Sequence, residues 1–223
     1  MDGLISSACF INYYNHNYIL TSNSSVTKKF PESIYVFDFN GHKIKEINDS
    51  KDPTYFIDIY YHINFDKNYI ITGNEGYIKV YDYNNNEVMH KYCDNSNNDH
   101  NSIIIDDKSL IIKIIESCED GNIRIWNFYS GELLNKIKIS NKRLYEICLW
   151  NEKYIFVGCE DGTLKLVELN NNLIINSLKG HNNKVLTVKK IIHSKYGECL
   201  ISQGYEYGKI ILWLNKNQIN KIL

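Results

Sequence analysis

One short pattern recurs five times along the 223-residue chain at nearly constant spacing. Each copy has an aliphatic residue at its second position, another at its fourth and a large apolar residue at its fifth. The copies are SIYVFD from Ser33, YIKVYD from Tyr77, NIRIWN from Asn122, TLKLVE from Thr163 and KIILWL from Lys209. Successive copies start 44, 45, 41 and 46 residues apart. Such self-similarity indicates a chain built from repeated copies of one supersecondary unit.

Each repeat also contains three further runs rich in β-branched and aromatic residues, separated by polar turns. In the fourth repeat the four runs cover 143–150, 153–158, 163–169 and 173–178, and the fifth repeat ends with a run at 218–223. Four strands in about 40–45 residues is the length of one β-propeller blade. We therefore predict an all-β protein without helices, a single propeller domain over 1–223. Its blades cover approximately 1–50, 51–98, 99–140, 141–180 and 181–223.

A turn containing glycine precedes four of the five repeated segments. A tight hairpin needs a residue that adopts positive φ without a Cβ clash, and glycine does so most easily. The first repeat carries Pro31-Glu32 instead, so we expect a different turn there. The predicted hairpin glycines are Gly76, Gly121, Gly162 and Gly208.

The sequences DGNIRIWN, DGTLKLVE and GHNNKVLTV followed by KIILW resemble the WD-repeat family of β-propellers. Blades of that family carry a Gly-His pair before the first strand and a Trp-Asp pair at the end of the third. The resemblance covers essentially the whole chain, although the individual motifs are degenerate. Gly180-His181 is the single Gly-His pair in the family's place, tryptophan is kept at Trp126 and Trp213, and no Trp-Asp pair is intact.

The resemblance implies a buried hydrogen-bonded set within a blade, made by a histidine, a strand serine or threonine, the turn aspartate and the tryptophan. We expect these residues to be structural rather than functional. By position they are Asp120 with Trp126 in blade three, Asp161 alone in blade four, and His181, Ser202 and Trp213 in blade five. Glu75 and Tyr207 occupy the aspartate position in blades two and five, so neither is expected to complete the set.

The charge balance argues against a protein that binds phosphates or a charged membrane. The chain has 25 Lys and Arg against 26 Asp and Glu, and Arg124 and Arg143 are its two arginines. We therefore expect no nucleic-acid partner and no membrane binding. The N-terminus lacks a basic segment followed by an apolar one, so no secretory signal is expected and a cytoplasmic location is favoured.

Cofactor and metal motifs are also lacking in the sequence. The six cysteines form no Cys-x-x-Cys pair, and we expect them to be free thiols. The seven histidines are dispersed, and no glycine-rich phosphate loop follows a strand. We therefore predict no cofactor and no bound metal.

The leading functional hypothesis is a non-catalytic scaffold that binds other proteins or peptides. The residue before the turn position in blades two to five is expected to project on one rim. Three acids there would favour a basic partner, although turn-adjacent acids are more often simply solvated. These candidate residues are Asn74, Glu119, Glu160 and Glu206.

An enzymatic function is the alternative to a scaffold. Some five-bladed propellers cleave glycosidic bonds with paired carboxylates, and Asp58 and Glu146 are the candidates on first strands.

The sequence also leaves open how the propeller is closed. The chain is a complete five-bladed ring, a piece of a longer propeller, or an open array completed by another chain. An open array exposes the apolar faces of its end blades, which favours self-association or completion by a partner.

Overall fold

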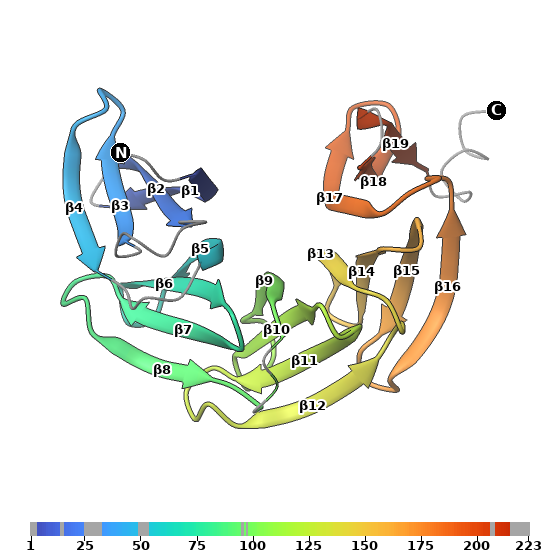
Figure 1. Cartoon of the computed structure of the whole chain (residues 1–223), viewed down its shortest axis with the longest axis horizontal. Coiled ribbons are helices and arrows are strands. Elements are labelled where there is room, and N and C mark those ends of the chain that lie inside the picture. Colours follow the sequence, from blue (N-terminus) through green and yellow to red (C-terminus); the bar gives the residue numbers. More distant parts are fainter. Residues whose placement is uncertain are drawn as a thin grey trace. The chain divides into compact units, whose positions relative to one another are not determined.

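The computed structural model describes residues 4–13, 16–24, 33–48, 54–94, 96, 98–205 and 208–214. In these ranges nineteen strands form five antiparallel sheets, and no α-helix is present. Each sheet consists of strands that are consecutive in the chain, as in the blades of a five-bladed β-propeller (Figure 1). The predicted all-β propeller fold is confirmed. Within the same ranges no helix is long and apolar enough to cross a membrane.

The sheets follow the predicted repeats closely. Blade one contains β1 (Leu4–Tyr13), β2 (His16–Ser24), β3 (Ser33–Asp38) and β4 (Lys43–Asn48). Blade two contains β5 (Thr54–His62), β6 (Lys67–Asn74), β7 (Tyr77–Asp82) and β8 (Val88–Tyr92). Blade three contains β9 (His100–Asp106), β10 (Lys113–Cys118), β11 (Asn122–Asn127) and β12 (Leu133–Lys138). Blade four contains β13 (Leu144–Asn151), β14 (Tyr154–Cys159), β15 (Thr163–Glu168) and β16 (Leu173–Lys179).

Blade five is described by three strands, β17 (Val185–His193), β18 (Gly197–Gly204) and β19 (Ile210–Trp213). The fourth strand predicted at 218–223 lies outside the described residues. The same holds for Glu206 and Tyr207 in the turn before β19.

The aliphatic second position of the repeat explains why blades stack. In blades one to four this residue is buried on the third strand, and its members are Ile34, Ile78, Ile123 and Leu164. In blade five the equivalent Ile210 is 62% exposed. A sheet with two apolar faces gains stability only when neighbours cover both faces. The exposure of Ile210 therefore marks a face of blade five that the described residues leave uncovered.

The described chain groups into two compact units. The first is Met1–His100 with Tyr129–Leu133, and its core joins blades one and two through residues such as Leu20, Val36 and Ile70. The second is Asn101–Phe128 with Leu134–Leu223. Its two apolar clusters join blade three to blade four and blade four to blade five.

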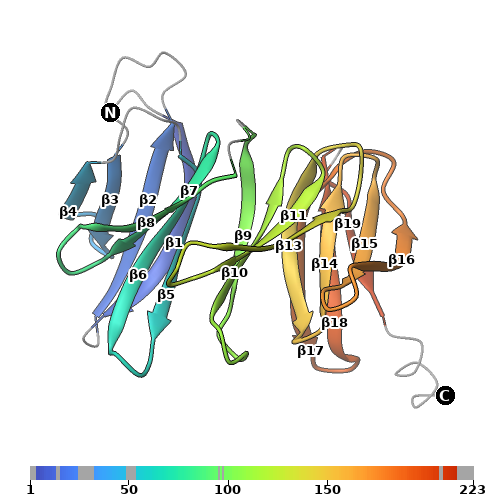
Figure 2. The same ribbon diagram turned by 90° about the horizontal axis from the view of Figure 1, so that it is seen from below.

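Within each unit, neighbouring first strands are tied together by a repeated polar contact. The side chain of one first strand accepts a hydrogen bond from a backbone N–H of the next first strand. Ser7 accepts from Ile57 at 3.3 Å, Ser102 from Ile147 at 3.3 Å and Glu146 from Val188 at 2.8 Å. Figure 2 shows one such pair, β13 and β17, side by side. These contacts satisfy backbone donors that would otherwise be buried without a partner.

The four hairpin glycines have positive φ, as predicted. The angles are 79° at Gly76, 77° at Gly121, 80° at Gly162 and 60° at Gly208. Gly121 also lies against the backbone that leads into blade four, because a Cβ there would be 2.0 Å from the carbonyl oxygen of Ser140. Gly162 repeats this relation with the carbonyl oxygen of His181 at 2.7 Å. At both positions glycine is required by conformation and by space.

We predict that Gly121→Ala lowers the free energy of unfolding by about 3 kcal/mol, because it adds a backbone clash to the strain of positive φ. Gly41→Ala is the matched control, since Gly41 has φ of 85° and nothing within 4 Å of its Cβ position. That variant should lose only about 1 kcal/mol. Urea unfolding of both variants measures the difference, and equal losses would contradict the steric part of the explanation.

Candidate functional site

Asn74, expected on the rim, is fully buried at the end of β6. Its Oδ1 accepts a hydrogen bond from Thr72 Oγ1 at 2.9 Å, and its Nδ2 donates to Thr54 Oγ1 at 3.1 Å. The side chain thus links the first and second strands of blade two. This correction removes Asn74 from the candidate surface, because a partner cannot reach a fully buried amide.

Glu119 and Glu160 lie at the surface of blades three and four, and both contact Arg143. The guanidinium of Arg143 pairs with the Glu119 carboxylate. The backbone N–H of Arg143 donates to Glu160 Oε2 at 3.4 Å. The predicted acidic rim is therefore a mixed cluster in these two blades, in which one arginine offsets part of the negative charge. Glu206 lies outside the described residues.

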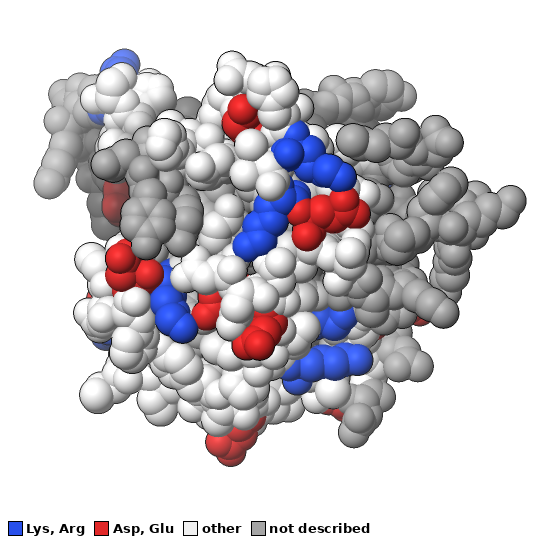
Figure 3. All heavy atoms as spheres, turned by 90° about the vertical axis from the view of Figure 1, so that its left-hand side faces the viewer, with Lys and Arg blue, Asp and Glu red and all other residues white. Residues whose placement is uncertain are grey.

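Charged side chains of both signs are also mixed on the face of the molecule shown in Figure 3. Lysines and arginines there lie beside acidic residues, and neither sign forms a continuous patch. Exposed ion pairs of blades one and two include Lys43–Glu46 at 2.6 Å and Lys67–Asp82 at 3.0 Å. Such exposed pairs contribute little to stability, and on this face they leave no large field of one sign.

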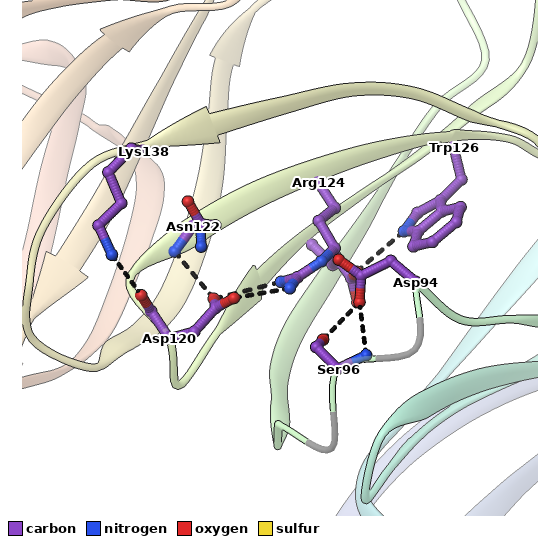
Figure 4. A network of polar contacts seen from close by, with 8 residues as sticks. Asp94, Ser96, Asp120, Asn122, Arg124, Trp126 and Lys138 are labelled. Carbon is purple, nitrogen blue, oxygen red and sulfur yellow. Dashed lines mark hydrogen bonds and ion pairs between the residues drawn. The ribbon is translucent and has the colours of Figure 1, made fainter.

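In blade three, Asp120 does not contact Trp126 as the family pattern implied. Its carboxylate instead accepts two hydrogen bonds from the fully buried guanidinium of Arg124, at 2.6 and 3.2 Å (Figure 4). The carboxylate also accepts the backbone N–H of Asn122 at 3.1 Å, and Lys138 Nζ donates to the backbone carbonyl oxygen of Asp120 at 2.7 Å. Trp126 donates its indole N–H to Glu116 at 2.9 Å. The expected set is replaced because the third strand of this blade carries a buried cation.

The electrostatics of Asp120 agree with this pairing. Burial works to raise its pKa, but the hydrogen bonds from Arg124 and Asn122 outweigh burial and hold the pKa below its usual value. In blade four the equivalent Asp161 is exposed, and among the described residues its carboxylate accepts hydrogen bonds from the backbone N–H and the hydroxyl of Thr163 alone. The two aspartates therefore occupy the same position of the repeat, but Asp120 pairs with a buried cation whereas Asp161 bonds to a neighbouring threonine.

Blade five does assemble the predicted trio of His181, Ser202 and Trp213. The indole N–H of Trp213 donates to Ser202 Oγ at 2.8 Å, and Ser202 Oγ lies 2.8 Å from His181 Nε2. Because the serine oxygen accepts from tryptophan, its hydrogen is available to a neutral histidine. The pKa of His181 is lowered, first by burial and then by the charge of Lys209. The trio joins the start of the blade to its second and third strands.

The two carboxylates considered for acid–base catalysis have different surroundings. Glu146 accepts the Val188 N–H and pairs with Lys189 at 2.5 Å, both on β17 of the neighbouring blade. Asp58 accepts the backbone N–H of Ile59 at 2.8 Å. Both contacts of Glu146 are therefore with the neighbouring blade.

The first unit also contains an aromatic cluster that was not predicted from the sequence. His62 is buried, and its ring centroid lies 4.6 Å from Phe65 and 6.1 Å from Tyr129. Phe65 is 61% exposed and the adjacent Ile63 is 78% exposed. The signal was present in the sequence HINF between two strands, where polar turn residues are usual. We call Ile63, Phe65 and Tyr129, together with the buried His62, the aromatic cluster.

We predict that Asp120→Asn lowers the free energy of unfolding by about 3 kcal/mol, because it leaves the buried guanidinium of Arg124 without its carboxylate. Asp161→Asn changes the same repeat position where no buried cation depends on it, and should cost less than about 0.5 kcal/mol. Chemical denaturation of the two variants makes the comparison. A loss at Asp120 no greater than that at Asp161 would show that the pair contributes nothing.

Because the pKa of His181 is lowered in the folded chain, the stability of the fold should depend on pH. The unfolded chain takes up a proton near the usual histidine pKa, about 6.5, before the folded chain does. Stability from this residue is therefore fully present above that pH and is lost as the pH falls below it through the lower pKa of the folded chain. Between about pH 7.5 and about pH 5.5, the melting temperature should fall more steeply for the native chain than for His181→Asn. Parallel slopes in a thermal scan would exclude His181 as the titrating group.

Comparison with known proteins supports the fold and no more. No protein-family model matches the sequence, and no curated protein matches it. Among solved structures, it is similar to U3-55K, with a TM-score of 0.73, 12% identity and coverage of 96% of this chain and 62% of that one. The computationally designed Ika8 protein gives a TM-score of 0.67 at 14% identity, with coverage of 94% and 58%. The chain thus spans about three fifths of the length of these two proteins.

Proposed function

We propose that this chain is a WD-type propeller module of the cytoplasm that binds other proteins and has no chemistry of its own. The propeller fold is compatible with this role, although fold alone does not determine function. The WD-type assignment is supported by the trio of His181, Ser202 and Trp213, which has the composition that the family resemblance implies. The proposed protein-binding role is argued from the residues exposed on the surface.

The observation that carries the proposal is the apolar character of the hairpins that join first and second strands. Ile63 and Phe65 are largely exposed on the β5–β6 hairpin, Leu110 is fully exposed between β9 and β10, and Ile192 is 84% exposed at the end of β17. The equivalent hairpin of blade four has polar residues at 151–153. Exposure of aliphatic and aromatic side chains to water is unfavourable in free energy. A protein partner that covers these side chains removes this cost, so the hairpin ends favour binding.

Within this set the aromatic cluster is the best anchor. Aromatic side chains bury a large area with few rotatable bonds, and they are enriched where binding energy is concentrated. Phe65 and Tyr129 are held by the buried ring of His62, so part of their ordering cost is already met in the free protein. The proposed partner therefore presents an apolar segment to this end of blade two.

The test compares Ile63→Ser with Phe65→Ser in one chain against a control double variant, Ile44→Ser with Ile174→Ser. The control residues are also exposed aliphatics, but they lie on the fourth strands β4 and β16. Affinity capture from the cells of origin, quantified by mass spectrometry, should show proteins that the native chain and the control retain and that the cluster variant loses at least tenfold. Equal melting temperatures establish that all three chains are folded.

Retention of every captured protein by the cluster variant would overturn the proposal, as would equal losses in the cluster and control variants. The first result would mean that the exposed rings are not a binding surface. The second would mean that capture depends on surface hydrophobicity in general.

A further inference from the structure

A small pocket lies between blades three and four, within the second unit. Its volume is about 210 Å³. Pockets for drug-sized ligands usually measure about 300–1,000 Å³, so this one has room for a single side chain rather than for a cofactor. The pocket is lined neither by the rim candidates nor by the residues of the hydrogen-bonded sets within the blades.

The inner wall of the pocket is aliphatic. Ile115 and Ile125 of blade three and Leu169 of blade four are buried members of the core that joins these blades. Leu134 extends this wall toward solvent and is partly exposed. An unbranched hydrocarbon stem packed along this wall would lose its contact with water without displacing any core residue.

A buried ion pair on the blade-three side of the lining has no net charge. The carboxylate of Asp106 is almost fully buried, accepts the Ser109 hydroxyl at 2.7 Å and lies 3.9 Å from the Nζ of Lys113. Lys113 also donates to Ser109 at 3.4 Å. Since the anion and the cation are held together, neither dominates the potential in the pocket.

The charge that remains is that of Glu152, on the hairpin between β13 and β14. Glu152 is exposed, and within the described part of the chain its carboxylate has no hydrogen-bond or ion-pair partner. The side-chain amide of Asn170, which also lines the pocket, likewise makes no hydrogen bond to a described residue. The lining therefore has one net negative charge and free acceptor oxygens at its polar side.

We propose that this pocket binds the side chain of a lysine from the protein partner. A lysine combines a flexible hydrocarbon stem with a compact ammonium group that has three donors and no acceptor. The stem lies along Leu134, Ile125 and Leu169, and the ammonium donates to Glu152 and to the amide oxygen of Asn170.

This inference rests on the proposed function, because it adds one chemical feature to the protein partner. Its test does not require the partner. The probe is Nα-acetyl-lysine methylamide, titrated into the isotope-labelled native chain and followed by amide NMR shifts. The comparison ligand is Nα-acetyl-norleucine methylamide, which has an aliphatic side chain without the ammonium.

We expect saturable shifts for the lysine derivative at Leu134, Glu152 and Asn170, with a dissociation constant on the order of millimolar. The norleucine derivative should bind at least five times more weakly. Glu152→Gln keeps the shape of the side chain and removes its charge, and should weaken lysine binding at least fivefold. Glu87→Gln, an exposed glutamate of blade two, is the matched control and should leave binding unchanged.

Equal binding of the two ligands, or equal effects of Glu152→Gln and Glu87→Gln, would overturn the pocket assignment. No saturable shift at these residues would overturn it as well. None of these outcomes bears on the capture experiment with Ile63 and Phe65, so failure of the pocket and failure of the proposed function are distinguishable.

Discussion

The structure depends on the burial of both apolar faces of each blade against its neighbours. Ile34, Ile78, Ile123 and Leu164 are buried on the third strands, where they occupy one position of the repeat. No single four-stranded sheet can bury both of its faces, so blades are stable only as an array. The polar contacts between first strands complete this packing by satisfying backbone donors, as when Glu146 accepts from Val188.

Much of this architecture could be predicted from the sequence, because period, alternation and turn chemistry are local properties of a repeat. The hairpin glycines follow from their position in the repeat, and the trio of His181, Ser202 and Trp213 was expected from the resemblance to the WD-repeat family. The pairing of Asp120 with Arg124 could not be predicted, because the repeat does not show which polar groups a third-strand side chain meets inside the blade. For the same reason Asn74 was expected at the surface, although it links two strands in the interior.

Most polar side chains that the sequence singled out are engaged within the protein. Glu119 pairs with Arg143, Asp120 with Arg124 and Glu146 with Lys189. The features that remain available to a partner are of another kind, namely exposed apolar residues on hairpins and the carboxylate of Glu152. The charged residues that the sequence singled out therefore contact other parts of the protein, whereas the residues in the proposed binding surface are mainly apolar.

We propose that the hairpins between first and second strands bind the partner, and hydrogen–deuterium exchange of the native chain, alone and in complex with a captured partner, can locate the bound surface. Slowed exchange on binding should be concentrated at residues 61–66 and in the other apolar hairpins. Slowed exchange confined to the hairpins between second and third strands, around Glu119 and Glu160, would instead place the partner on the charged rim and overturn the proposal.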